Sequence, residues 1–150
     1  MTSRPPPLFT RLTRLLVLAA WVLLGLASAQ ATPLTAAEEQ GVREAVQGQL
    51  AAFAADDANK AFSYATPHVR ETMGNAASFL ALVRKAYPMV YRPASVTFLK
   101  PESRDGQVIQ RVQVLDAAGT SWLAIYGLER HGNAWRISGC VVVEDKRRMA

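Results

Sequence analysis

The chain has 150 residues and a formal net charge of +5, from 17 Lys and Arg residues against 12 acidic ones, and it contains a single cysteine. Three of the basic residues and none of the acids lie in the first 29 positions, so the rest of the chain carries only 14 − 12 = +2. This small, scattered charge excludes a surface that binds nucleic acid by neutralising phosphates, and one cysteine excludes an internal disulfide.

The first 29 residues are typical of a secretory signal peptide. Three arginines precede an apolar run from Leu15 to Leu26, and Ala27-Ser28-Ala29 supplies the small residues of a cleavage site. A retained membrane helix is the weaker alternative, because spanning a bilayer requires roughly 20 apolar residues. We therefore expect cleavage after Ala29, a periplasmic or secreted location, no stable membrane insertion after cleavage, and one domain over residues 30–150.

The next segment is expected to be helical. Thr35-Ala36-Ala37-Glu38 forms a capping box, which predicts that a helix begins there. An apolar stripe at helical spacing follows this start, and a stripe of this kind packs against a core. Its members are Val42, Val46, Leu50 and Phe53.

Asp56-Asp57 lies where this stripe ends, and an aspartate there predicts the cap of a second helix through Ala65. The functional alternative is a carboxylate pair for acid–base chemistry, but adjacent helical residues do not face each other. Thr66-Pro67 predicts a further helical turn, with His68 beside it as a partly exposed residue. Another helix is expected from about Asn75 until Pro88 ends it.

Beyond Pro93 the pattern changes to strands, and two turns fix how three of them pair. Strands are expected over residues 95–99, 107–115, 120–130 and 134–143. Asp116-Ala117-Ala118-Gly119 predicts a three-residue hairpin loop, and Gly132-Asn133 predicts a type II′ turn. The first turn sets Gln110 opposite Tyr126. The second sets Leu128 opposite Ile137 and, continued without interruption, Tyr126 opposite Gly139.

This register predicts an apolar inner face, covered by the helices, with a small candidate pocket in it. Gln110 and Tyr126 are polar exceptions on that face, and Gly139 leaves space over the phenol ring. An amide, a phenol and a gap in an apolar wall are what a small ligand-binding pocket requires. The alternative is a satisfied buried hydrogen bond involving the two side chains.

The same register predicts a mixed outer face with a candidate interface. Its apolar members are Leu123, Ile125, Cys140 and Val142, which predicts a homodimer through this face unless a terminal segment covers it. Cys140 is expected to be a half-buried thiol, with an intermolecular disulfide as the alternative. Neither this cysteine nor the two histidines show metal-ligand spacing, so we expect no metal and no cofactor.

Several motifs together resemble a known family. They are Gln49-Leu50-Ala51-Ala52-Phe53, Asp56-Asp57, Ala61-Phe62, Thr66-Pro67, Phe79-Leu80-Ala81-Leu82-Val83, Tyr87-Pro88 and Trp135-Arg136-Ile137-Ser138-Gly139-Cys140. In this order the chain resembles an exported proteobacterial family known as domain of unknown function 4864, and more loosely the nuclear transport factor 2-like superfamily. The resemblance implies an α+β fold in which three N-terminal helices pack on a curved four-stranded antiparallel sheet, a cone enclosing a pocket.

The resemblance implies no single activity, because that superfamily contains isomerases, dehydratases, binding proteins and structural modules. Ketosteroid-isomerase-like members use an aspartate base and a tyrosine donor. Tyr126 matches the donor, but the predicted register places no acid on the inner face of the last three strands. We therefore expect a noncatalytic envelope domain that binds a small apolar ligand or closes on itself. A cofactor-free hydrolase or isomerase, and a protein-interaction module, are the alternatives.

Overall fold

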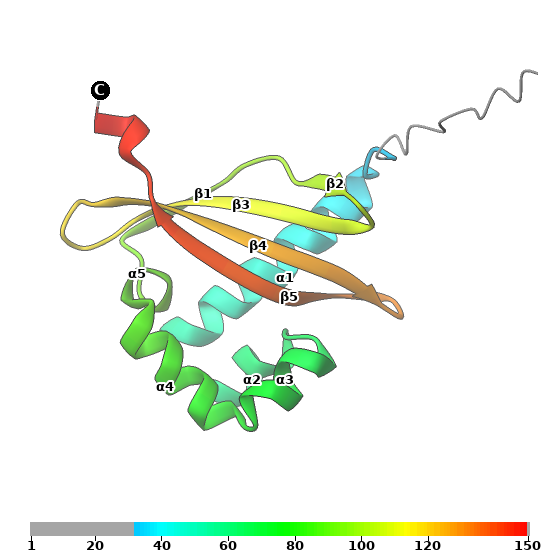
Figure 1. The fold of residues 1–150 in the computed structure, drawn as a ribbon, viewed down its shortest axis with the longest axis horizontal. Coiled ribbons are helices and arrows are strands. Elements are labelled where there is room, and N and C mark those ends of the chain that lie inside the picture. Colours follow the sequence, from blue (N-terminus) through cyan, green and yellow to red (C-terminus); the bar gives the residue numbers. More distant parts are fainter. Residues whose placement is uncertain (1–31, 150) are drawn as a thin grey trace, which may run out of the picture.

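The computed structural model describes residues 32–149, so the predicted signal peptide lies outside the described residues. Figure 1 shows helices followed along the chain by an antiparallel sheet. The fold is therefore α+β, as expected. The helices are α1 (Ala36–Ala54), α2 (Ala58–Ser63), α3 (Pro67–Met73), α4 (Ala76–Ala86), α5 (Pro88–Tyr91) and the 3₁₀ turn η1 (Lys146–Met149). The strands are β1 (Ser95–Phe98), β2 (Glu102–Arg104), β3 (Gln107–Leu115), β4 (Ser121–His131) and β5 (Ala134–Glu144).

Helix α1 begins at the predicted capping box. The backbone N–H of Thr35 donates to the Glu38 carboxylate at 2.9 Å, and the N–H of Glu38 donates to the Thr35 hydroxyl at 3.2 Å. These two bonds satisfy amides that lack a partner at a helix start. The predicted apolar stripe is buried: its least buried member, Leu50, is only 8% exposed.

Helices α2, α3 and α4 begin at capping side chains. Asp57 accepts from the N–H of Lys60 at the start of α2, Thr66 caps α3, and Asn75 caps α4. Pro88 ends α4 as predicted, but it also opens the four-residue α5, which was not predicted. A proline fits the first helical position because its missing N–H has no partner there anyway.

The sheet has five strands in place of the expected four. Its order is β1-β3-β4-β5, and the short β2 also pairs with β3. Asp105 and Gly106, with φ of 51° and 78°, form the tight turn between β2 and β3. Two consecutive positive φ angles are the requirement of a type I′ hairpin, for which Asp-Gly is a preferred pair. The sequence signal for β2 was therefore present.

The predicted register is confirmed for β3–β4 and wrong for half of β4–β5. Gln110 pairs with Tyr126, and Leu128 pairs with Ile137, as predicted. A register shift between Gly127 and Leu128 then moves every later pair by one residue, so Tyr126 lies opposite Cys140 instead of Gly139. A bulge of this kind places an extra residue in one strand and reverses which side chains face inward beyond it.

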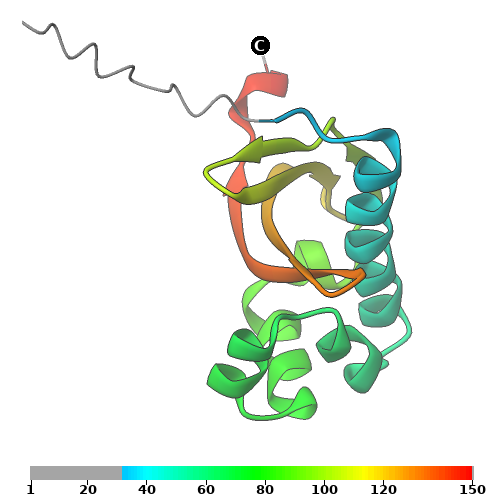
Figure 2. The ribbon, with the colours of Figure 1, turned by 90° about the vertical axis from the view of Figure 1, so that its right-hand side faces the viewer.

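The sheet curves strongly, and the helices occupy its inner side. Figure 2 shows α1 running along one side of the curved sheet while the shorter helices close the end below it. The connector between α2 and α3 attaches to β5, because Thr66 N–H donates to Ile137 O at 2.9 Å and Ile137 N–H donates to Tyr64 O at 2.8 Å. The core lies between sheet and helices, and its largest fully buried side chains include Tyr126, Phe53 and Leu128. Within residues 32–149 no helix has the length and apolar character needed to cross a bilayer.

Candidate functional site

A cavity of about 280 Å³ lies between helices α1 and α3–α5 and strands β4 and β5. Its size is just below the usual lower limit for small-molecule sites, roughly 300 Å³. The wall is mainly apolar and is formed by Gln49, Phe53, Ala65, Val69, Met73, Phe79, Leu82, Val83, Tyr87, Val90, Tyr126, Ile137, Ser138, Gly139, Cys140 and Val142.

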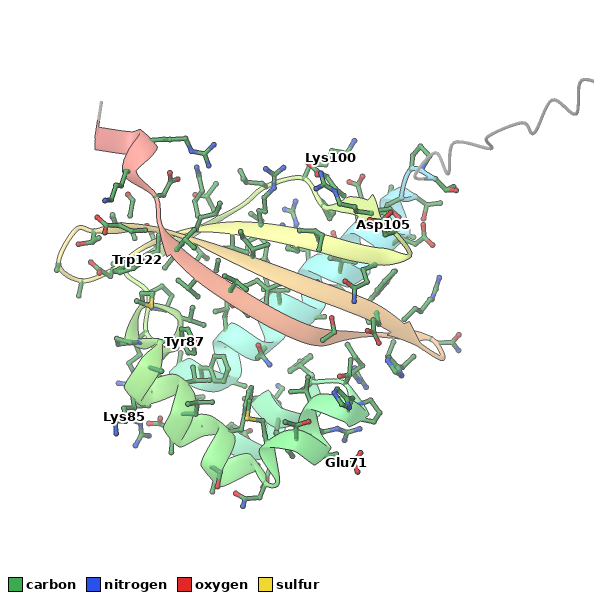
Figure 3. All side chains as sticks on the ribbon, in the orientation of Figure 1. Glu71, Lys85, Tyr87, Lys100, Asp105 and Trp122 are labelled. Carbon is green, nitrogen blue, oxygen red and sulfur yellow. The ribbon has the colours of Figure 1, made fainter. Side chains whose placement is uncertain are left out.

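The cavity has a buried floor and an exposed rim. Tyr126 and Phe53 at the floor are each 1% exposed, whereas Leu82 and Tyr87 at the rim are 42% and 37% exposed. Figure 3 labels Tyr87 at the end of α4, below the strands. Two large apolar side chains at the rim of an apolar cavity indicate that it is open to solvent on that side.

The bulge in β4–β5 determines which residues of β5 enter the cavity. Cys140 and Val142 line it and pack against the core. The sequence placed both residues on the outer face, and the extra residue at the bulge overturns that placement. Gly139 also lines the wall, but it does so one position away from the place predicted for it, opposite Gly127.

The two titratable groups at the floor are held in their neutral forms. Burial raises the pKa of the Tyr126 phenol well above its ordinary value of 10.0, and the neighbouring Cys140 adds to this effect. Burial also raises the pKa of the Cys140 thiol to about 12, against a smaller opposing effect of a hydrogen bond with Tyr126. A low-dielectric environment disfavours the charged form of both groups. At neutral pH the floor therefore presents a phenol and a thiol.

Gln49 is the polar residue of the site that the sequence analysis missed. Its side chain is on α1, is 4% exposed, and donates from Nε2 to Ala61 O at 3.2 Å. Gln49 follows Val42 by seven residues, which places it on the buried stripe of the helix. A polar residue at a buried stripe position was the available signal.

Gln110 does not line the cavity, although it is fully buried and pairs with Tyr126 across the sheet. Its Nε2 donates to Leu99 O at 2.7 Å and to Arg111 O at 2.9 Å. Among residues 32–149 its Oε1 has no hydrogen-bond partner. The alternative prediction for Gln110 was a satisfied buried hydrogen bond. Only its amide nitrogen makes such bonds, and the partners of that nitrogen are backbone carbonyls.

Asp56 and Asp57 point to different partners. Asp57 caps α2, while Asp56 accepts from Arg84 at 2.9 Å, from Arg92 at 3.0 Å and from the Tyr91 hydroxyl. The hydrogen bond from Tyr91, followed by that from Arg84, lowers the pKa of Asp56 below its ordinary value of 3.8. This aspartate connects the end of α1 to α4 and α5, so the pair does not form a shared acid–base site.

The outer face of the sheet carries a second, shallower hollow of about 500 Å³. It lies beside the facing glycines Gly127 and Gly139, and Ile109, Ile125 and Val141 border it. The corrected register replaces Cys140 and Val142 on this face with Val141 and Val143, which are 60% and 44% exposed. Leu123, another predicted interface residue, is only 8% exposed, so the monomer itself already buries it. A group of three or more potential metal-ligating side chains is not found within residues 32–149.

One comparison with known proteins identifies a family. The family model described as "Domain of unknown function (DUF4864)" matches residues 35–150. This match covers more than half of the chain, so the chain belongs to that family. A search of curated proteins finds no match.

Proposed function

We propose that this member of the DUF4864 family is an exported domain that binds a small apolar ligand in the cavity between α1, α3–α5 and β4–β5, without transforming it. The observation that carries the proposal is an apolar cavity with an exposed rim and a neutral polar floor. A few polar groups in an apolar wall orient a ligand, and the wall supplies the affinity through the hydrophobic effect.

The titration behaviour of the floor favours binding over catalysis. A hydrolase or isomerase requires a group that exchanges a proton near neutral pH. Cys140 and Tyr126 are shifted away from neutrality, and the described wall contains no carboxylate or imidazole. An apolar ligand needs neither group for binding.

The test uses the mature protein and two matched variants on one strand. Native mass spectrometry of protein purified gently from the periplasm looks for a retained small molecule, and an NMR titration with 1-octanol follows the methyl groups of the cavity wall. Val142→Trp places an indole in the cavity, while Val143→Trp places the same group on the opposite face of β5. We expect 1-octanol to shift the methyl resonances of Ile137 in wild type and Val143→Trp, and not in Val142→Trp. Equal binding by both variants, or none by wild type, contradicts the proposal.

A second candidate function is self-association through the outer sheet face, and the corrected register favours it. This face carries the exposed side chains of Val141 and Val143 and, bordered by Val141, the hollow beside Gly139. A two-fold dimer brings one surface against itself, so the exposed valines of one copy would cover the hollow of the other. A second copy of this chain is therefore the partner that we propose.

The oligomeric state tests this second candidate. Analytical ultracentrifugation of the mature protein at tens of micromolar should detect a dimer that Val143→Glu disrupts. Leu82→Glu is the matched control, because Leu82 is similarly exposed but belongs to the cavity rim. A monomer in wild type removes the dimer proposal and leaves the ligand proposal untouched.

We propose export from the sequence pattern of the first 29 residues, which the described residues do not include. Expression of the full chain in a bacterium, followed by fractionation and mass analysis, tests it. The expected product is periplasmic or secreted and begins at Gln30. A cytoplasmic product that retains Met1 contradicts export.

A further inference from the structure

We infer that the ligand of this cavity is an uncharged molecule with an apolar body and one carbonyl group, which the Tyr126 phenol binds at the floor. The inference rests on the proposed function and names the class of ligand for the same site. Three features of the wall carry it: the absence of charge, the polar groups at the floor, and the volume.

The wall selects against charged ligands. Its described residues include no Asp, Glu, Lys, Arg or His. A carboxylate or ammonium entering the cavity would lose its hydration without gaining an ion pair, which is costly in an apolar environment. A neutral ligand loses much less hydration.

The Tyr126 hydroxyl is a donor without a strong acceptor. Its neighbour is the Cys140 thiol, and sulfur accepts hydrogen bonds weakly. The phenol is 1% exposed, lines the cavity and keeps its proton, so its O–H remains a donor for a ligand bound there. A carbonyl oxygen in the cavity would give this O–H a stronger acceptor.

Gln49 extends the preference to carboxamides. Its Nε2 donates one hydrogen to Ala61 O at 3.2 Å, and its side chain lines the cavity. We infer that the second N–H and the oxygen of Gln49 serve a ligand in the cavity that this residue lines. A carboxamide offers a carbonyl to one side chain and an N–H to the other, so it complements the floor better than an alcohol does.

The volume of the cavity accommodates about ten non-hydrogen atoms of a ligand. A cavity of about 280 Å³ has the volume of roughly nine liquid waters, at about 30 Å³ each. An eight-carbon chain with one polar end group is of this size. Octanamide, octanoate, octylammonium and 1-octanol form a matched series that differs only in that end group.

The experiment measures the dissociation constants of these four compounds by NMR titration of the cavity methyl groups at pH 7. Octanamide should bind at least about tenfold more tightly than octanoate and octylammonium, since only the charged ligands lose uncompensated hydration. Octanoate should bind more tightly as the pH falls through the pKa of its own carboxyl group, because its neutral form enters the cavity.

Tyr126→Phe tests the hydrogen bond while keeping the ring. The variant should lose most of the preference for octanamide over 1-octanol and still bind 1-octanol, which shows that its cavity is intact. Octanoate binding as tightly as octanamide in wild type, or an unchanged preference in Tyr126→Phe, overturns the inference and leaves the proposed function standing. Failure of all four compounds to shift the methyl resonances overturns the proposed function, and the inference with it.

Discussion

Cys140 is half-buried, as the sequence predicted, and lies beside Tyr126 on the cavity side of β5, so this position determines the reactivity of its thiol. The thiolate is the reactive form, and burial raises the pKa of this thiol from 9.0 to about 12. At a pH below 9 the thiolate fraction should be roughly a thousandfold lower in the folded protein than in the unfolded chain. We expect alkylation by iodoacetamide to be slower by about that factor in native protein than in guanidinium.

A neighbouring cysteine provides the control for this prediction. Val141→Cys in a Cys140→Ala background places a thiol on the outer face, where the native side chain is 60% exposed. That variant should react at nearly the rate of an unfolded thiol. Similar native rates for the two proteins would mean that Cys140 does not face the cavity.

Two glycines should respond differently to alanine. In a helix interior, alanine is normally more stabilising than glycine by about 1 kcal/mol. A Cβ on Gly48 would nevertheless overlap the Tyr64 ring, whereas a Cβ on Gly139 meets nothing within 4 Å. Urea denaturation should show that Gly48→Ala lowers the free energy of unfolding by about 1–3 kcal/mol, as overpacking does. Gly139→Ala should stay within about 0.5 kcal/mol of wild type. Stabilisation by Gly48→Ala would contradict the packing of Tyr64.

Single residues were predictable where one local pattern determines them. The capping box at Thr35 and the buried positions of α1 follow from spacing alone. Gln49 was missed because the stripe was defined by its apolar residues alone, and Gln49 is a polar residue at a stripe position. The hydrogen bonds of Gln110 to Leu99 O depend on a chain segment 11 residues away, whose position no local pattern gives.

At the scale of elements, the bulge between β4 and β5 is the main difference from prediction. The Gly132-Asn133 turn fixed the first pairs correctly, but an ungapped register cannot contain an extra residue. Glycines inside strands often mark bulges, and Gly127 and Gly139 face each other next to the shift. The two glycines were therefore a usable signal, although the register alone did not require a bulge.

Asp56 connects three helices, and its effect should depend on pH. Its folded-state pKa is lowered, so its contribution to stability is present above the ordinary value of 3.8 and is lost as the pH falls through the folded-state pKa. Asp56→Asn keeps a residue that tolerates the positive φ of 54° but removes the ion pairs with Arg84 and Arg92. We expect a lower urea midpoint than wild type at pH 7 and a smaller difference below pH 3.8.

Asp57→Asn is the matched control for that variant. Asparagine caps a helix about as well as aspartate, so this change should preserve the cap of α2 and leave the midpoint nearly unchanged. A loss in Asp57→Asn as large as that in Asp56→Asn would show that the ion pairs are not the cause.

At the scale of the whole molecule, the α+β class and the helix-then-sheet order were predictable, because the spacing of apolar residues changes once, near Pro93. A pocket beside Tyr126 was also predicted, but its helical wall was not. It exists because α3, α4 and α5 close one end of a curved sheet, and the positions of short helices depend on tertiary contacts such as Thr66 with Ile137. The phenol was identified from the sequence, while its neighbours in the cavity depended on the bulge.

The buried phenol of Tyr126 and the half-buried thiol of Cys140 should make the whole fold sensitive to alkali. Both pKa values are higher in the folded state, so between pH 9 and 12 the unfolded chain has lost protons that the folded protein retains. Stability is therefore fully present below about pH 9 and decreases as the pH rises, by up to about 1.4 kcal/mol per pH unit for each group. Urea denaturation at pH 8, 9, 10 and 11 should show this loss. The Tyr126→Phe, Cys140→Ala double variant should start lower at pH 8 because of its altered packing, but with a flatter dependence on pH. A wild-type slope that persists in the double variant would assign the alkaline loss to other groups.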